Sequence, residues 1–195
     1  MLLANYRKCL ILKGDVYIDE LYYKLIKSDI PEKKGKEKHG LSHNQFCIGI
    51  GCDENNIYCQ IEKMGKPSTD STMITFIDHI KKGSKLIHDA EKSHNGLVQE
   101  LKLQSTVYHS KDLKGIPDED NPLDPINKAC NRVKSFLNSH KGFNRDHLQG
   151  LIDLYVFIYN TPIDNLEKID FLIKYALDEK TLHRYRDKPS FLSSN

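Results

Sequence analysis

The stretch VYIDELYY, residues 16–23, places two carboxylates inside a run of β-branched and aromatic residues that is typical of a strand. Burying an unpaired charge is strongly unfavourable, so a strand with acids at its centre needs something that neutralises them. Neighbouring side chains of a strand alternate between its two faces. We therefore expect Asp19 and Glu20 to point to opposite sides of a sheet, with Glu20 as a support or surface residue.

Working outward from this strand, the hydrophobic pattern predicts a mixed order of elements. Strands are predicted over residues 16–25, 45–52, 57–63, 84–90 and 103–109. Helices are predicted over residues 69–82, 93–101, 125–139, 145–159 and 165–177. The short turn DENN joins the second and third strands into a hairpin, which predicts a three-stranded antiparallel meander. The β-α-β unit that follows implies parallel pairing.

This element order is similar to that of ribonuclease-H-like nucleotidyltransferase domains. The predicted fold class is therefore α/β, with a mixed sheet of a three-strand antiparallel meander plus two parallel strands, flanking helices and a helical C-terminal part. The predicted division is an N-terminal remnant (1–13), a ribonuclease-H-like domain (14–160) and a C-terminal helical extension with a tail (161–195).

Carboxylates and their partners fall where such domains place a site. Asp19 lies in the first strand, Asp89 ends the fourth, and Asn127 begins a later helix. Lys134, two helical turns on, returns to the face of Asn127. Two converging aspartates repel each other unless cations lie between them, and Mg²⁺ or Mn²⁺ takes oxygen ligands. The sequence thus predicts two such ions on Asp19, Asp89 and Asn127, with Lys134 neutralising phosphate or transition-state charge.

Four stretches carry a resemblance to a known family: VYIDELYY, GLSHNQFCIGIGCDENN, KLIHDAEKSHNGLVQEL and NPLDPINKACNRVKSFLNSHKGFNRDHLQGLIDLYVFIYN. Together they resemble the bacterial insertion-sequence transposases whose DDE-like catalytic set is Asp-Asp-Asn-Lys, over roughly residues 14–186. The resemblance implies that Asp19, Asp89 and Asn127 are metal ligands and that Lys134 is the signature lysine. It also implies DNA strand cleavage and transfer, with insertion-sequence ends and target DNA as partners, a homo-oligomer on DNA, and a location on the bacterial nucleoid in the cytoplasm.

One departure leaves an alternative open. Transposases of this group normally carry an N-terminal DNA-binding part with a zinc ribbon built on C-x-x-C pairs, whereas the five cysteines here form no such pair. We therefore expect a truncated catalytic domain. The alternative is a catalytically silent DNA-binding or oligomerising remnant that regulates a full-length transposase.

Other signals are weaker. The net charge of +2 announces no nucleic-acid binder, so basic surfaces must come from local clusters. Lysines in the segment 33–38 suit a DNA backbone, although a solvated loop is the simpler interpretation, and His109, Lys111 and Lys114 are weaker candidates. The pair His88-Asp89 is similar to the His-Asp step of metal phosphohydrolases. That class is all-helical, and this pair closes a strand.

Overall fold

The described part of the computed structural model, residues 2–24, 45–140, 145–160, 162 and 164–177, is built on one mixed five-stranded sheet. Its strands are β1 (Asp15–Lys24), β2 (Gln45–Cys52), β3 (Ile57–Met64), β4 (Lys85–Asp89) and β5 (Gln104–Tyr108). They lie in the order β3-β2-β1-β4-β5. The first three form an antiparallel meander, and β4 is parallel to both β1 and β5. The predicted fold class is confirmed, and the architecture is compatible with a ribonuclease-H-like fold.

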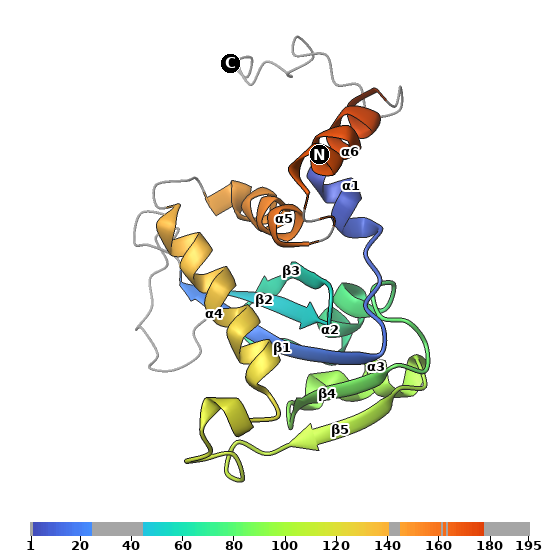
Figure 1. The fold of residues 1–195 in the computed structure, drawn as a ribbon. Helices are drawn as coiled ribbons and strands as arrows, with labels where there is room; N and C mark the ends of the chain where they lie inside the picture. The colour runs from blue at the N-terminus through green and yellow to red at the C-terminus, as the bar shows by residue number, and fades with distance from the viewer. Residues whose placement is uncertain (1, 25–44, 141–144, 161, 163, 178–195) are drawn as a thin grey trace, which may run out of the picture.

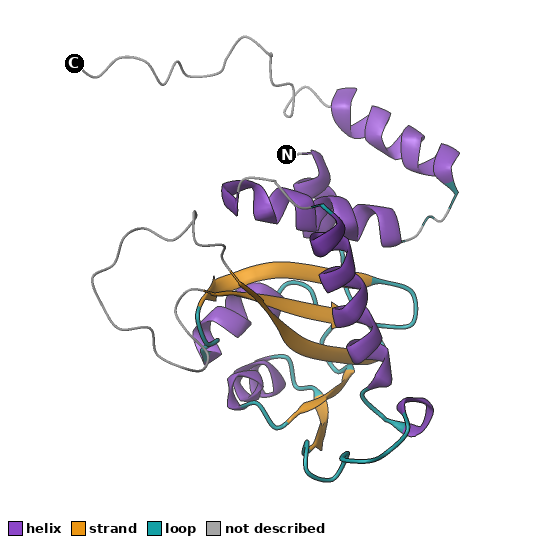
Figure 2. Cartoon of the chain, turned by 90° about the vertical axis from the view of Figure 1, so that its left-hand side faces the viewer, coloured by secondary structure: helices purple, strands orange, loops and turns teal. Residues whose placement is uncertain are grey.

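Helices lie on both sides of this sheet (Figures 1 and 2). The α-helices are α1 (Leu2–Lys8), α2 (Thr69–Phe76), α3 (Asn95–Glu100), α4 (Asp124–Ser139), α5 (Leu148–Tyr159) and α6 (Asn165–Leu177). Single 3-10 turns are η2 (Lys92–His94), η3 (Asp118–Asp120) and η4 (Arg145–His147). Helices α4 and α5 cover one face, where they form one hydrophobic core with the sheet, and α2 and α3 cover the other, where a second core lies.

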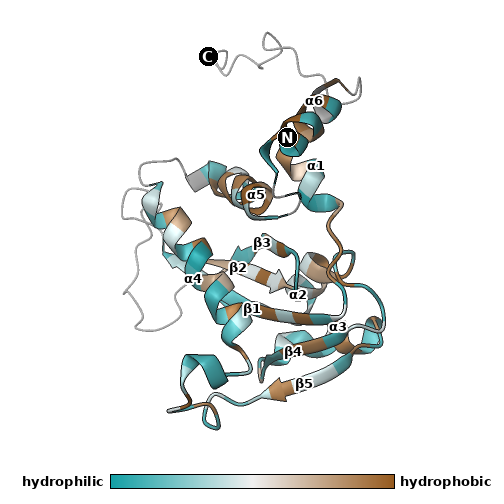
Figure 3. Ribbon diagram, in the orientation of Figure 1, coloured by the Kyte–Doolittle hydropathy of each residue, from teal (hydrophilic) through white to brown (hydrophobic). Residues whose placement is uncertain are grey.

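Helix α4 shows why the sequence forms this layer. Its colours alternate between apolar and polar along the helix (Figure 3). The buried residues recur at helical spacing and are Ile126, Ala129, Val133 and Leu137. The apolar stripe fixes which way α4 faces, so the polar residues between are left on its outer and lateral surfaces.

Helix α2 is shorter than the sequence predicts. The predicted helix runs to Lys82, but α2 ends at Phe76, and Ile80 instead forms a parallel bridge with Leu12. The backbone N–H of Leu12 donates to the carbonyl of His79 (2.8 Å), and that of Lys81 donates to the carbonyl of Leu12 (2.9 Å). Ile77 and Ile80 therefore fit the spacing of a helix in the sequence, but in the structure Ile80 pairs with a segment far away in the sequence. The predicted start is confirmed, with Ser68 as the N-cap.

Glycines in β2 let α2 approach the sheet closely. A Cβ atom on Gly51 would lie 2.8 Å from Cδ1 of Leu12 and 3.1 Å from Cε1 of Phe76. On Gly49 it would lie 2.6 Å from Oε1 of Glu62 and 3.1 Å from the Phe76 ring. The Phe76 ring therefore packs directly against the backbone of Gly49 and Gly51.

The first residues of the chain take part in the packing. Helix α1 contacts α5, and the side chain of Leu12 is fully buried. The buried Arg7 guanidinium donates from Nε to Oδ1 of Asp153 on α5 (2.6 Å) and from a second nitrogen to the Tyr58 hydroxyl (3.1 Å). The predicted division at residues 13 and 160 remains a prediction, and the segment 25–44 and the tail 178–195 lie outside the described residues.

We expect Asp153→Ala to lower the free energy of unfolding by about 3–5 kcal/mol, because it leaves the buried Arg7 cation without its carboxylate. Lys128→Ala is the matched control: it breaks an exposed pair with Asp124 on one helix, which is worth about 0.5 kcal/mol. Denaturant unfolding measures both values. Equal losses in the two variants would show that the Arg7 pair does not hold α1 to α5.

Candidate functional site

Strand β1 carries side chains into both layers of the molecule. Tyr17 and Leu21 pack against the core under α4 and α5, whereas Ile18 belongs to the core under α2 and α3. Because side chains alternate along a strand, Asp19 faces the α4 side and Glu20 the α2–α3 side. The two acids that adjoin in the sequence therefore enter different environments.

Asp19 and Asp89 lie side by side on neighbouring parallel strands. Ile18 of β1 pairs with His88 of β4, so the two aspartates follow one residue later on each strand. Neighbouring strands are about 4.8 Å apart, and paired positions of parallel strands point to the same face. The fold thus places the two aspartates at neighbouring backbone positions, at the carboxyl end of β4, and the convergence of their side chains on shared ions remains a prediction.

The electrostatics of Asp19 suit a cation. Burial raises the pKa of its carboxyl group to about 6, and the charges of Glu20 and Asp89 act in the same direction. The backbone N–H of Glu20, which donates to Oδ1 of Asp19 at 2.8 Å, opposes the shift. Burial and the acidic neighbours therefore both disfavour the ionised form of Asp19, and a positive ion beside it would offset both effects.

Asn127 and Lys134 are both exposed and both belong to α4. The helix packs against β1, and Asp19 is among the charges that raise the pKa of the Cys130 thiol after the larger effect of burial. Cys130 lies one helical turn after Asn127 and one before Lys134. This places the predicted helix face close to Asp19, while the meeting of Asn127 with the two aspartates remains a prediction.

Glu20 is a support residue rather than a surface one. Its side chain is only 6% exposed, and its Oε1 lies 2.8 Å from Nε2 of His94, whose side chain is fully buried. The predicted orientation toward the opposite face from Asp19 agrees with this contact. Glu20 is thus tolerated in the strand because His94 of η2 contacts it on the α2–α3 side of the sheet.

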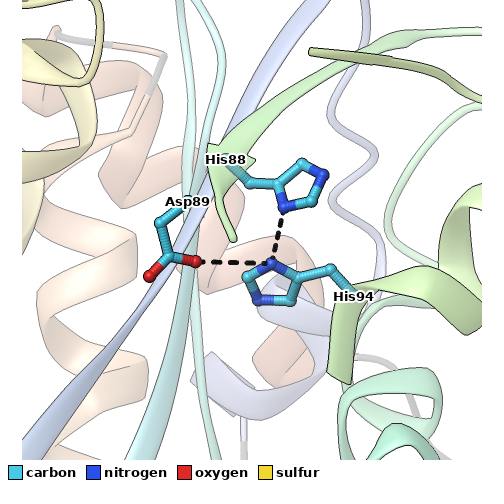
Figure 4. A group of neighbouring side chains, drawn as sticks. All are labelled: His88, Asp89 and His94. Atoms are coloured by element: carbon cyan, nitrogen blue, oxygen red, sulfur yellow. Dashed lines mark hydrogen bonds and ion pairs between the residues drawn. The ribbon is translucent and has the colours of Figure 1, made fainter. Parts of the chain in front are cut away.

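A chain of polar contacts continues from His94. Its Nδ1 lies 2.9 Å from Nδ1 of His88, and Nε2 of His88 lies 3.0 Å from the hydroxyl of Ser105 on β5. Oδ1 of Asp89 lies 3.9 Å from Nδ1 of His94, which therefore stands between the other two side chains (Figure 4). The backbone N–H of Glu91 donates to the same oxygen of Asp89 (3.0 Å).

The two histidines differ in their affinity for a proton. Burial lowers the pKa of His88 to about 4, with a further decrease from the charge of His94. Burial also opposes a charge on His94, but the hydrogen bond to Glu20 and the charges of Glu20, Asp89 and Glu62 outweigh it and raise its pKa. At neutral pH, His88 is a neutral imidazole with a free pair of electrons to offer.

His88, Asp89 and His94 form a group that could hold a metal ion. One ligand atom from each residue can be chosen so that all lie within 4.8 Å of one another. Two imidazole nitrogens and one carboxylate oxygen are ligands of zinc and other transition ions, whereas Mg²⁺ prefers oxygen alone. Asp89 therefore belongs both to this group and to the carboxylate pair with Asp19.

A second, partly buried acid, Glu62 on β3, lies on the same face as Glu20. Its Oε2 accepts hydrogen bonds from the hydroxyls of Thr72 (3.0 Å) and Ser71 (3.2 Å), while its buried Oε1 has no hydrogen-bond partner among the described residues. Burial, followed by the charge of Glu20, raises the pKa of Glu62 to about 7. The α2–α3 side of the sheet thus carries two acids, Glu20 and Glu62, whose negative charge is offset only in part by His94.

The sequence interpretation missed His94 and the role of Glu62. His94 lies shortly after the pair His88-Asp89, with which β4 ends. This clustering of histidines around an aspartate was the signal in the sequence that could have identified it. Among the basic candidates, His109, Lys111 and Lys114 are exposed in the segment between β5 and α4. The lysine cluster at 33–38 lies outside the described residues.

Comparisons with known proteins leave the family open. No family model and no curated protein matches the chain. A solved structure that is similar, the cryoEM structure of simian T-cell lymphotropic virus intasome in complex with PP2A regulatory subunit B56 gamma, matches with a TM-score of 0.46 and 8% identity. The match covers 78% of this chain and 50% of that chain, so this chain spans about half of its length. Within the described residues, no helix has the length and apolar character needed to cross a membrane.

We expect Glu62→Gln to stabilise the protein at pH 8 but hardly at pH 5. The pKa of Glu62 in the folded state, about 7, lies above its ordinary value of 4.5, so the folded protein holds this proton more tightly than the unfolded chain. The cost of ionising Glu62 therefore grows as the pH rises from about 4.5 through 7 and is fully present above that. The variant avoids this cost, and we expect a gain of about 1–3 kcal/mol at pH 8.

Denaturant unfolding at the two pH values measures this gain. Glu54→Gln, in the exposed turn between β2 and β3, controls for the loss of one negative charge. A gain of the same size at pH 5 and pH 8 would contradict the assigned cause.

Proposed function

We propose that this chain is the catalytic domain of a DNA transposase that cleaves and transfers DNA strands at the ends of an insertion sequence. Asp19, Asp89 and Asn127 hold two Mg²⁺ or Mn²⁺ ions, and Lys134 contacts the DNA. The partners are the element's ends and target DNA, and the active form is a homo-oligomer assembled on DNA, located with the bacterial nucleoid. The observation that carries the proposal is that Asp19 and Asp89 directly follow Ile18 and His88, which pair on the parallel strands β1 and β4.

Three properties of the site support this chemistry. Asp19 and Asp89 each follow a residue of the Ile18–His88 pair that joins β1 and β4, and α4, which carries Asn127 and Lys134, packs against β1. Asp19 is partly buried with a raised pKa, which makes a bound cation favourable. The donors on this face are oxygens of two carboxylates and one amide, and such a set fits Mg²⁺ or Mn²⁺. The element order is similar to that of ribonuclease-H-like nucleotidyltransferase domains, and this similarity implies a site for phosphodiester chemistry at these acids.

The residues divide the work of an in-line displacement. The bound ions, when present, neutralise the attacking and leaving oxygens of a phosphodiester. Asp19 and Asp89 fix the position of the site on rigid strands, and Asn127 adds a neutral oxygen from α4. Lys134, exposed on the same helix, offers a positive charge to a DNA phosphate. Water first attacks the phosphodiester at the element's end and displaces its 3′-oxygen. The released 3′-hydroxyl then attacks a phosphodiester of the target DNA and displaces that strand's own 3′-oxygen, without a covalent enzyme intermediate.

We expect Asp19→Asn to abolish Mn²⁺-dependent nicking of supercoiled plasmid DNA and the joining of 3′-hydroxyl oligonucleotides to it. The substitution keeps the shape of the side chain but removes the charge that the ions require. Calorimetry should show Mn²⁺ binding to the parent protein and its loss in the variant. Asp112→Asn, in the exposed loop after β5, is the matched control and should behave as the parent. Undiminished nicking by a correctly folded Asp19→Asn protein would refute the proposed site.

We expect Lys134→Ala to slow nicking by at least ~10-fold while leaving Mn²⁺ binding unchanged, because the lysine acts on the phosphate and not on the ions. Lys128→Ala removes a lysine from the same helix whose Nζ is already paired with Asp124 at 2.6 Å. The rates of the two variants are compared with the same plasmid in the same salt. Equal effects would assign Lys134 to the general positive surface of α4.

The second candidate function is a catalytically silent DNA-binding or oligomerising remnant that regulates a full-length transposase. The observation that favours it is Asn127, since an amide oxygen in place of a third carboxylate gives the ligand set one negative charge fewer. The calorimetric experiment separates the two functions. A parent protein that binds DNA, does not bind Mn²⁺ and produces no nicked plasmid would establish the silent form.

A further inference from the structure

We propose that His88, Asp89 and His94 form a second metal site, specific for a first-row transition ion such as Zn²⁺, on the α2–α3 side of the sheet. This site is separate from the oxygen ligands of Asp19 and Asn127, although Asp89 belongs to both. The proposal does not depend on the DNA chemistry, because it rests on the side chains around η2 and the end of β4.

The first step concerns the orientation of His94. Its Nε2 lies 2.8 Å from Oε1 of Glu20, and a carboxylate only accepts hydrogen bonds. Nε2 therefore carries the hydrogen and donates it to Glu20. In the neutral ring, Nδ1 is left with its electron pair directed into the space between His88 and Asp89.

The second step concerns His88. Its Nδ1 lies 2.9 Å from Nδ1 of His94, while its Nε2 lies 3.0 Å from the hydroxyl of Ser105, which can accept a hydrogen from the ring. The Ser105 hydroxyl can also donate to Nε2 of His88, which leaves the ring hydrogen on Nδ1 for a hydrogen bond to His94. When Nε2 of His88 carries the hydrogen instead, two electron pairs face each other across 2.9 Å. Such an arrangement is repulsive unless a proton or a metal ion lies between the nitrogens.

The spacing of the three ligand atoms favours a metal ion. A tetrahedral ion with bonds of about 2.0–2.1 Å separates its ligand atoms by about 3.3 Å. The distances from Nδ1 of His94, 2.9 Å to His88 and 3.9 Å to Asp89, lie on either side of that value. The three atoms, all within 4.8 Å of one another, would move to this common spacing around an ion, with a fourth position left for water.

The surroundings also match a built metal site. A ligating histidine usually donates its other nitrogen to a carboxylate or another acceptor, which fixes the ring. Glu20 does this for His94 and Ser105 does it for His88. Both rings are almost completely buried, at 1% exposure for His88 and 0% for His94. Two nitrogen ligands select Zn²⁺, Co²⁺ or Ni²⁺ over Mg²⁺.

Occupancy would have a mechanical consequence. The ion would tie η2 to the end of β4 and hold the carboxylate of Asp89 toward His94. Because Asp89 also stands beside Asp19, the transition ion would set the orientation of a carboxylate that the other face uses.

The test titrates the metal-free full chain with Co²⁺ and Zn²⁺. We expect one equivalent of Co²⁺ to give the visible bands of a tetrahedral ion, Zn²⁺ to displace it, and X-ray absorption at the zinc edge to show imidazole ligands without sulfur. His88→Ala should remove the bands, and Glu20→Gln should weaken affinity by about 10–100-fold through loss of the outer hydrogen bond. His109→Ala, at an exposed histidine, should bind as the parent does.

Asp19→Asn separates this proposal from the proposed function, since it should lose DNA nicking and keep Co²⁺ binding. The measurements on the parent protein decide the matter even where a variant fails to fold. Sulfur ligands in the zinc spectrum, or Co²⁺ binding that is equal in His88→Ala and the parent, would overturn the site. Absence of any Co²⁺ or Zn²⁺ binding by the parent would also overturn it and leave a shared proton between the two rings.

Discussion

The register of β1 against β4 is the constraint on which the rest of the site depends. Pairing of Ile18 with His88 places Asp19 beside Asp89 on one face and leaves Glu20 on the other, within reach of His94. A shift of one residue would reverse the faces of every side chain on β1. The apolar neighbours Tyr17 and Ile18, each committed to a different core, prevent that shift, so the packing of the two cores fixes the positions of the acids.

The two acids of β1 are stabilised in different ways. Glu20 has its partner within the protein, because the imidazole of His94 donates a hydrogen bond to it in a buried setting. Among the described residues, Asp19 accepts the N–H of the next residue, and its pKa is raised by burial and acidic neighbours, with the charge of His94 opposing this shift. The net effect disfavours the ionised form of Asp19, and a bound cation would offset it. This contrast is the physical reason for assigning binding to Asp19 and support to Glu20.

The sequence predicts the sheet well because its signals are local. The alternating pattern of β1, the hairpin turn at DENN and the stripe on α4 each depend on neighbouring residues. The placement of Asp19 and Asp89 on adjacent strands was implied by the similarity of the element order to ribonuclease-H-like domains. The features that the sequence does not predict arise where distant segments meet. Helix α2 ends before Lys82 because Ile80 pairs with Leu12, and the partner of Glu20 is His94, 74 residues away. No local pattern reports either contact.

Asp89 shows why the end of a strand suits a site that serves two layers. A side chain in the middle of a strand is committed to one face by the alternation of the backbone. At the last residue of β4 the chain turns into η2, and the carboxylate of Asp89 keeps 36% exposure. One of its oxygens accepts the N–H of Glu91 and approaches His94 from the α2–α3 side, while its Cα remains in line with Asp19 on the other face. Asp89 is therefore the one described side chain shared by both groups, and the conformation of the β4–η2 turn determines how its charge is divided between them.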